Sequence, residues 1–171
     1  MHEDENDQHQ RGLRILVVDD NYDAARSMSM LLELEGHRTG TVHNGLEAVR
    51  EATRVRYDAV LLDLGMPVMD GFQAAAALRQ LWPAPALIAH SAWDDAETLR
   101  RTADLGFYMH LRKPVCFQVL QAALRELPRL RLSAEDVDAQ RVGGLVHTFP
   151  NAVPLKSNAG ALSSPCPRDR S

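Results

Sequence analysis

Residues 59–72 read AVLLDLGMPVMDGF, and this stretch contains the local signals that decide the fold. Ala59 to Leu62 form an apolar run without alternation, which is typical of a parallel strand covered by helices on both faces. Asp63 ends the run, the Met-Pro pair that follows favours a turn, and Asp70 suits the first cap of a helix. The stretch therefore predicts a buried strand, an acidic residue at its carboxyl end and a following helix.

Similar units recur along the chain from Leu13 to Leu127. Short aliphatic runs alternate with helical patterns and return after about 20 to 30 residues, the length of one strand and its crossover helix. The expected strands are Leu13–Val18, His37–Val42, Tyr57–Leu62, Ala86–His90 and Phe107–Leu111. Five such βα units predict an α/β fold with an open, doubly wound parallel sheet, whose ligand crevice lies beyond the carboxyl ends of the strands.

The segments between these strands carry helix signals. Apolar stripes mark the first and the fifth helix: Ala24, Ala25, Met28, Leu31 and Leu32, and Val115, Val119, Leu120, Ala123, Leu124 and Leu127. The expected helix limits are an end at Gly36 for the first, Asn44 to Arg54 for the second, Asp70 to about Leu81 for the third, Asp94 to near Gly106 for the fourth, and Pro114 to Pro128 for the fifth.

The 171 residues suffice for one domain of ordinary size. Apolar residues make up 45% and charged residues 25%, as in soluble globular proteins. We expect the domain at residues 13–127, a disordered acidic arm at residues 1–12, and a disordered tail at residues 128–171. The tail is rich in Ser, Pro, Gly, Ala and Asn, and we expect no output domain in it.

Charge and cysteine content exclude several classes of protein. A formal net charge of −4 argues against a protein that coats nucleic acid or an anionic membrane. Cys116 and Cys166 are isolated thiols without a partner at metal-ligand spacing, so neither a disulfide framework nor a zinc site is indicated. No apolar run approaches the ~18 residues of a membrane span. We therefore expect a cytoplasmic protein with no membrane partner.

Polar residues stand at the carboxyl ends of the expected strands. Asp19 and Asp20 follow the first, Asp63 the third, Ser91 the fourth and Lys113 the fifth. Three carboxylates at one sheet edge stay ionised near neutral pH only with a cation between them, and Mg²⁺ prefers oxygen ligands. Aspartate can accept a phosphoryl group, whose charge Mg²⁺ and Lys113 would neutralise, and the Ser91 hydroxyl can donate a hydrogen bond to it. Taken singly each residue is a weak signal, but their joint order is specific.

Four motifs resemble the receiver domain of two-component response regulators: VVDD at 17–20, LLDLGMPVMDGF at 61–72, SA at 91–92 and LRKP at 111–114. The resemblance covers roughly Leu13 to Leu127. It implies a flavodoxin-like, five-stranded sheet of order 2-1-3-4-5 and autocatalytic transfer of a phosphoryl group from a phosphohistidine to Asp63. It also implies a rearrangement of the face formed by the fourth helix, the fifth strand and the fifth helix.

The same resemblance implies individual roles. Asp20 would bind Mg²⁺ directly, Asp19 directly or through water, and the carbonyl group of Gly65 would be a further ligand. Lys113 and Ser91 would contact the phosphate. The Lys113–Pro114 bond is expected to be cis, as the corresponding bond often is in the family.

Two positions depart from the family pattern or modify it. His110 stands where the family usually has the Tyr or Phe of an aromatic switch, and we expect His110 or Tyr108, two residues apart, to line the output surface. Trp93 is expected to lie over the acyl phosphate and to hinder water, while Gly65 offers no side chain to guide that water. Slow self-dephosphorylation is the resulting hypothesis, and a surface tryptophan packed on a helix is the plain alternative.

The expected function is that of a phosphoacceptor signalling protein that assists its own phosphorylation and dephosphorylation, rather than an enzyme. Its partners would be a sensor histidine kinase or a histidine phosphotransfer domain, and a downstream protein. The alternative is a DNA-binding transcriptional regulator with the tail as a rudimentary effector, although no basic recognition helix follows Leu132. A phosphatase or flavin-binding protein of the same fold class is disfavoured by Gly65, where a second acid would stand, and by Asp19 to Tyr22, which replace a glycine-rich phosphate loop.

Overall fold

The computed structural model describes residues 12–127, and the expected tail at 128–171 and nearly all of the arm at 1–12 lie outside them. A five-stranded parallel sheet forms the centre of the molecule, in the order β2-β1-β3-β4-β5. The strands are β1 (Arg14–Val18), β2 (Arg38–Val42), β3 (Ala59–Asp63), β4 (Ala86–Ser91) and β5 (Met109–Arg112). This order confirms the doubly wound architecture.

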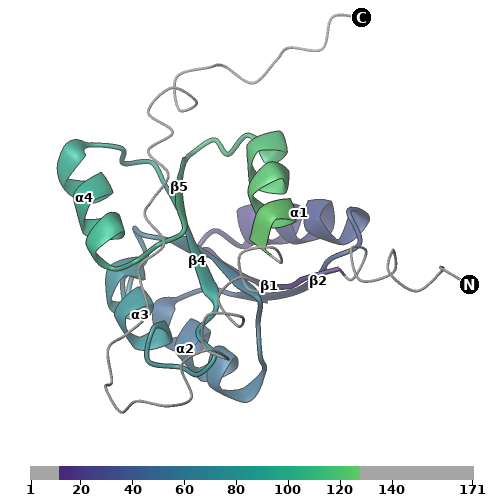
Figure 1. Cartoon of the computed structure of the whole chain (residues 1–171), viewed down its shortest axis with the longest axis horizontal. Coiled ribbons are helices and arrows are strands. Elements are labelled where there is room, and N and C mark those ends of the chain that lie inside the picture. The colour runs from purple at the N-terminus through teal and green to yellow at the C-terminus, as the bar shows by residue number, and fades with distance from the viewer. Residues whose placement is uncertain (1–11, 128–171) are drawn as a thin grey trace, which may run out of the picture.

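Helices cover both faces of the sheet (Figure 1). They are α1 (Tyr22–Leu34), α2 (Gly45–Arg54), α3 (Gly71–Leu78), α4 (Ala96–Asp104) and a C-terminal helix at residues 117–127. Figure 1 shows α1 beside the green C-terminal helix, with α2 and α3 on the opposite side of the sheet. Within residues 12–127, no helix has the length and apolar character needed to cross a membrane.

Two apolar layers hold the helices on the sheet. Successive strand residues point to opposite faces, so Leu16 and Val18 of β1 pack in one layer and Ile15 and Val17 in the other. The first layer adds residues of α2 and α3, and the second adds Leu32 of α1 and residues of the C-terminal helix. Because both faces are buried, β1 and β3 show no alternation of apolar and polar residues, as the sequence predicted.

Side-chain caps start α2 and α3 where they were expected, whereas the fifth helix begins at residue 117 rather than directly after Pro114. Asn44 accepts a hydrogen bond from the amide of Glu47 in the first turn of α2, and Asp70 forms a capping box with Gln73 of α3. The cap expected at Asp94 for α4 is wrong, because Asp95 accepts the amides of the first turn. Asp94 instead forms an ion pair with Arg112, at 3.0 Å.

Other limits differ from expectation by a few residues. The third helix ends at Leu78 rather than near Leu81, because the next amides bond to carbonyl groups three residues back in a tighter turn. In α1, Ala24 and Leu31 are exposed, and Ser29 shares the buried face with Ala25 and Leu32, so the expected stripe was too wide. Two predicted features are confirmed: Gly36 has a left-handed φ of 87° after α1, and the C-terminal helix buries Leu120, Ala123, Leu124 and Leu127.

Candidate functional site

Three carboxylates meet at the carboxyl end of the sheet. β1 and β3 are neighbours with Val18 opposite Leu62, so both strands end at the same level. Each carboxylate of Asp19, Asp20 and Asp63 offers an oxygen, and these oxygens lie within 4.8 Å of one another. Asp19 and Asp63 are buried, whereas Asp20 is exposed to solvent. The structure therefore brings together the three acids that the sequence placed at this edge.

Lys113 reaches into this cluster from the end of β5. Its Nζ donates hydrogen bonds to Asp63 Oδ2 at 2.7 Å and to Asp19 Oδ2 at 3.0 Å. Burial alone would lower the pKa of Lys113, but the hydrogen bonds and charges of Asp63 and Asp19 outweigh it and raise the pKa. The Lys113–Pro114 peptide bond is cis, as expected. The lysine is thus a charged ammonium shared by two carboxylates.

Backbone amides hold the other oxygen of each buried acid. Asp63 Oδ1 accepts the N–H of Gly65 at 2.9 Å, and Asp19 Oδ1 accepts the N–H of Asn21 at 2.9 Å. In both cases the donor lies two residues further on, which is the pattern of an Asx turn. Each carboxylate is therefore fixed in orientation by its own backbone amide and by the Lys113 ammonium that the two share.

Glycine is required where α3 begins. A Cβ at Gly71 would overlap the carbonyl oxygen of Asp63 and lie 2.7 Å from Leu64 Cα. The amide of Gly71 donates to Leu64 O at 3.2 Å, so the helix start is bonded directly to the segment after β3. The position of the Asp63 backbone thus depends on the absence of a side chain at residue 71.

Ser91 and Trp93 form another side of the site, at the end of β4. Ser91, the buried last residue of β4, accepts the backbone N–H of Trp93 on its hydroxyl oxygen at 3.0 Å. The Trp93 ring lies against Gly65: a Cβ built on Gly65 would be 3.1 Å from Trp93 Cη2 and 3.8 Å from Asp63 Oδ1. The indole and the Asp63 carboxylate therefore flank the same glycine, although 52% of Trp93 remains exposed.

A family model for the response regulator receiver domain matches residues 15–125. The chain belongs to this family. The matched segment contains every residue of the acid cluster, Lys113, Ser91 and Trp93. The observed strand order is also that of receiver domains of known structure.

The relatives include transcriptional regulatory proteins, a phosphotransferase and receiver domains of known structure. The transcriptional regulatory protein PrrA of Mycobacterium leprae is 40% identical over 123 residues, 69% of this chain and 51% of PrrA. The sporulation initiation phosphotransferase F of Bacillus subtilis is 28% identical over 113 residues, 68% of this chain and 91% of that protein. The receiver domain of the Francisella response regulator 1452 superposes with a TM-score of 0.66 at 26% identity, covering 70% of this chain and 99% of that one. This receiver thus spans about half the length of the PrrA relatives.

Receiver domains typically bind Mg²⁺ at an acidic pocket, and the residues of this receiver fit such an ion. Three carboxylates and one ammonium leave two negative charges in a small, partly buried volume. All the side-chain donors of the cluster are carboxylate oxygens, the ligands that Mg²⁺ prefers. A divalent cation would therefore balance the charge that Lys113 leaves uncompensated.

Of the two residues of which one was expected to line the output surface of this receiver, Tyr108 is partly exposed, whereas His110 is not exposed. Its side chain is buried, and the Nε2 atom is 3.0 Å from the carbonyl oxygen of Trp93. A carbonyl oxygen only accepts, so Nε2 carries the proton and donates it. Burial lowers the pKa of His110, which opposes protonation of the second nitrogen. The residue in the switch position is thus bonded inward, to the loop that carries Trp93.

Sequence reasoning missed two further histidines beside the acids. His90 of β4 is buried, with Nε2 3.4 Å from Val18 O and 3.9 Å from Asp19 Oδ2, and burial lowers its pKa. His43 Nδ1 donates to Asp19 O at 3.1 Å, and its ring stacks on Tyr22 with centroids 3.6 Å apart. The available signal for His90 was a polar residue inside an apolar strand. For His43 no local signal existed, because its partner lies on another strand.

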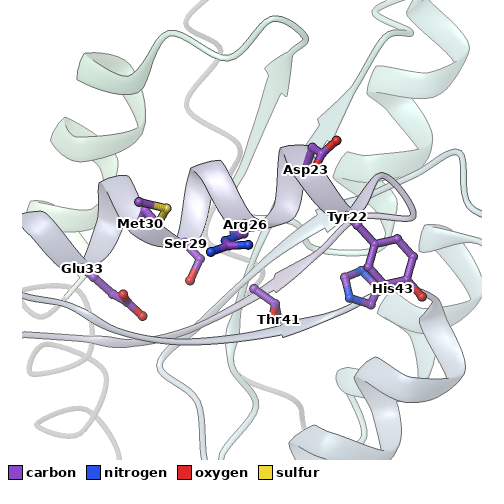
Figure 2. A pocket seen from close by; sticks show the side chains of 8 residues that line it. All are labelled: Tyr22, Asp23, Arg26, Ser29, Met30, Glu33, Thr41 and His43. Carbon is purple, nitrogen blue, oxygen red and sulfur yellow. The ribbon is translucent and has the colours of Figure 1, made fainter.

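The Tyr22–His43 stack closes one end of a hollow between α1 and β2. Figure 2 shows this hollow, with the two rings side by side at one end and Glu33 and Met30 at the other. Its lining residues are Tyr22, Asp23, Arg26, Ser29, Met30, Glu33, Thr41 and His43. None of the residues expected to do chemistry lines it, so it lies beside the acid cluster rather than within it.

Proposed function

We propose that this receiver accepts a phosphoryl group on Asp63 from the phosphohistidine of a sensor histidine kinase or of a histidine phosphotransfer domain. The observation that carries the proposal is the Lys113 ammonium bound to both Asp63 and Asp19 within the acid cluster. The phosphorylated receiver would then act through contact with a downstream protein. The role is that of a signalling protein rather than of an enzyme that turns over a separate substrate.

The residues divide the proposed transfer between them. A carboxylate oxygen of Asp63 forms the bond to phosphorus while the P–N bond of the phosphohistidine breaks, and the imidazole leaves with the electron pair. The transferring group keeps its negative charge throughout, so catalysis consists of positioning and charge neutralisation. Lys113 provides one positive charge within hydrogen-bond distance of Asp63. The Gly65 amide fixes the orientation of the carboxylate.

Asp19, Asp20 and Asp63 would hold Mg²⁺, with the carbonyl group of Gly65 as a further ligand. When bound, the ion supplies the positive charge that a doubly negative cluster needs before a phosphate can approach. Asp20 is the exposed member of the set and Asp19 the buried one. Asp19 also shares Lys113, so we assign direct ligation first to Asp20 and Asp63.

Ser91 can bind the phosphoryl group without giving up its present contact. Its hydroxyl oxygen accepts the Trp93 amide, and a hydroxyl that accepts still has its own proton to donate. A phosphoryl oxygen on Asp63 would receive that proton, which links the phosphate to the loop after β4. The Trp93 ring, beside Gly65 and Asp63, would then restrict the approach of water to the acyl phosphate. Slow self-dephosphorylation follows.

A transcriptional regulatory role is the second candidate. Relatives that are 40% and 37% identical to this chain over the aligned residues are named transcriptional regulatory proteins, and this receiver spans about half of their length. In that role the receiver would control a further DNA-binding segment. The two candidates share the chemistry at Asp63 and differ in what the phosphorylated face contacts.

The test is incubation of the full chain with acetyl phosphate, with and without Mg²⁺, followed by intact-mass measurement. Wild type should gain the mass of one phosphoryl group only with Mg²⁺, and Asp63→Asn should gain none. Asp104→Asn, the same change at an exposed residue of α4, is the matched control and should behave as wild type. Equal phosphorylation of Asp63→Asn, or none in wild type, would overturn the proposal.

A further inference from the structure

We infer that His110 is a positioning residue that holds the Trp93 ring beside Asp63 and thereby prolongs the life of the acyl phosphate. The inference rests on the proposed function, because it concerns the fate of the phosphoryl group on Asp63. It assigns to the imidazole a task that a Tyr or Phe at the same place cannot perform in the same way.

The backbone of Trp93 is bound from two strands. Its N–H is donated to Ser91 Oγ of β4 at 3.0 Å, and its carbonyl oxygen accepts the Nε2–H of His110 of β5 at 3.0 Å. Ser91 and His110 are both buried, so the groups that they contribute to the two bonds are shielded from bulk water. With both peptide groups fixed, the Cα–Cβ direction of Trp93 is fixed, and the ring is aimed at Gly65.

The second imidazole nitrogen shows what the residue contributes. His110 Nδ1 is a buried acceptor that has no hydrogen-bond partner among residues 12–127. A phenyl ring would occupy similar space and would not bury such an unpaired acceptor. What the imidazole has and the phenyl ring lacks is the Nε2–H bond to Trp93. Burial disfavours the charged form of the ring, whereas Asp94 and Asp95 favour it. The effect of burial is larger, so the pKa of His110 is lowered and the ring that donates Nε2–H is uncharged.

The affected step is hydrolysis of the acyl phosphate. The oxygen of a water molecule forms a bond to phosphorus, the bond between phosphorus and the Asp63 oxygen breaks, and the carboxylate leaves with the electron pair. The water protons end on inorganic phosphate or in solvent. Water must reach phosphorus on the side opposite the leaving oxygen, and a ring held against Gly65 narrows that approach. A ring released by loss of the His110 bond would narrow it less.

The test measures the loss of the phosphoryl mass over time, after removal of acetyl phosphate, with Mg²⁺ present. His110→Phe should hydrolyse about threefold to tenfold faster than wild type, the effect expected of one net hydrogen bond. His110→Gln can present an N–H at a similar distance and should recover most of the wild-type lifetime. His110→Leu replaces His110→Phe if the phenyl variant does not fold, as judged by circular dichroism.

A double-mutant cycle separates positioning from a general structural effect. Trp93→Ala should hydrolyse faster than wild type, and adding His110→Phe to it should cause no further acceleration, because the ring to be positioned is gone. Multiplication of the two effects would overturn the inference. So would an unchanged lifetime in His110→Phe while wild type is phosphorylated normally, whereas failure of wild type to be phosphorylated would overturn the proposed function itself.

Tryptophan fluorescence gives an independent reading. The chain has two tryptophans, and Trp82→Phe leaves Trp93 as the only one. In this background, His110→Phe should shift the Trp93 emission to longer wavelength, as the freed ring becomes more solvated, and His110→Gln should not. An identical spectrum in all three proteins would contradict the inference.

Discussion

Lys113 Nζ lies 2.7 Å from Asp63 Oδ2, so the proposed phosphoacceptor and the cation that would stabilise its phosphate are already in contact. The same ammonium binds Asp19 at 3.0 Å. It therefore stabilises the acids and also repels any second cation that enters the cluster. Lys113 and Mg²⁺ would therefore compete for the negative charge of the same carboxylates.

Lys113→Met should raise the affinity for Mg²⁺ while slowing phosphorylation. A unit charge about 4 Å from a divalent ion repels it by about 2 kcal/mol even at the dielectric constant of water, so removing the ammonium should lower the Kd at least about fivefold. The rate of phosphorylation by acetyl phosphate should fall at the same time, because the ammonium no longer neutralises the transferring group. Isothermal titration calorimetry and timed mass measurements check the two effects.

Lys113→Arg is the matched control, since it keeps the positive charge. It should leave the Kd for Mg²⁺ within about twofold of wild type. An unchanged or weaker affinity in Lys113→Met would show that the ammonium does not oppose the ion, and this reading of the cluster would have to be abandoned.

Replacement of Val68, in the loop between β3 and α3, should make the protein more stable. It is a β-branched residue with φ of 70°, and its side chain is 82% exposed. The left-handed conformation costs such a residue about 1–2 kcal/mol, whereas Asn adopts it more readily. Val68→Asn should therefore raise the free energy of unfolding by about 0.5–1 kcal/mol in urea denaturation. A loss of stability would show that the Val68 side chain has a packing role.

Stability should decrease as the pH falls below about 6.5. Burial lowers the pKa of His110 and of His37 from the ordinary value of 6.5, so these groups bind fewer protons in the folded than in the unfolded chain. The free energy of unfolding then rises with pH through the window below 6.5 and levels off above it. Denaturation curves between pH 5 and 8 check this.

His110→Phe isolates one contribution to that dependence. The variant has no titrating group at 110, so its stability should fall less steeply between pH 6.5 and 5 than that of wild type. At pH 7 its stability should stay within about 1 kcal/mol of wild type, because the lost hydrogen bond and the relief of the unpartnered Nδ1 offset each other. Parallel pH profiles would contradict the assignment.

The strand order and the acid cluster could be predicted because they depend on chain-wide patterns. Apolar runs covered on both faces mark parallel strands, and their polar ends must meet at one edge. Asp19, Asp20, Asp63 and Lys113 lie together for that reason. Trp93 packs against Gly65 beside Asp63, and its place over an acyl phosphate stays a prediction.

The remaining features depend on tertiary contacts that local patterns do not encode. Asp94 and Asp95 are equally good caps in sequence, and the ion pair of Asp94 with Arg112 leaves Asp95 to cap α4. His110 or Tyr108 was expected on the output surface, but His110 bonds inward to Trp93, which lies in the loop after another strand. His90 looked like part of an apolar strand, and its position beside Asp19 follows only from the pairing of β4 with β3 and of β3 with β1.

The most direct test of the central claim is chemical trapping of the phosphorylated residue. The chain is phosphorylated with phosphoramidate, whose P–N bond imitates a phosphohistidine, in the presence of Mg²⁺, and then reduced with borohydride, which converts an aspartyl phosphate to homoserine. Peptide mass spectrometry should find homoserine at residue 63 and at no other aspartate. Homoserine at Asp19 or Asp20, or its absence from residue 63 of a chain that has gained phosphate, would contradict the account.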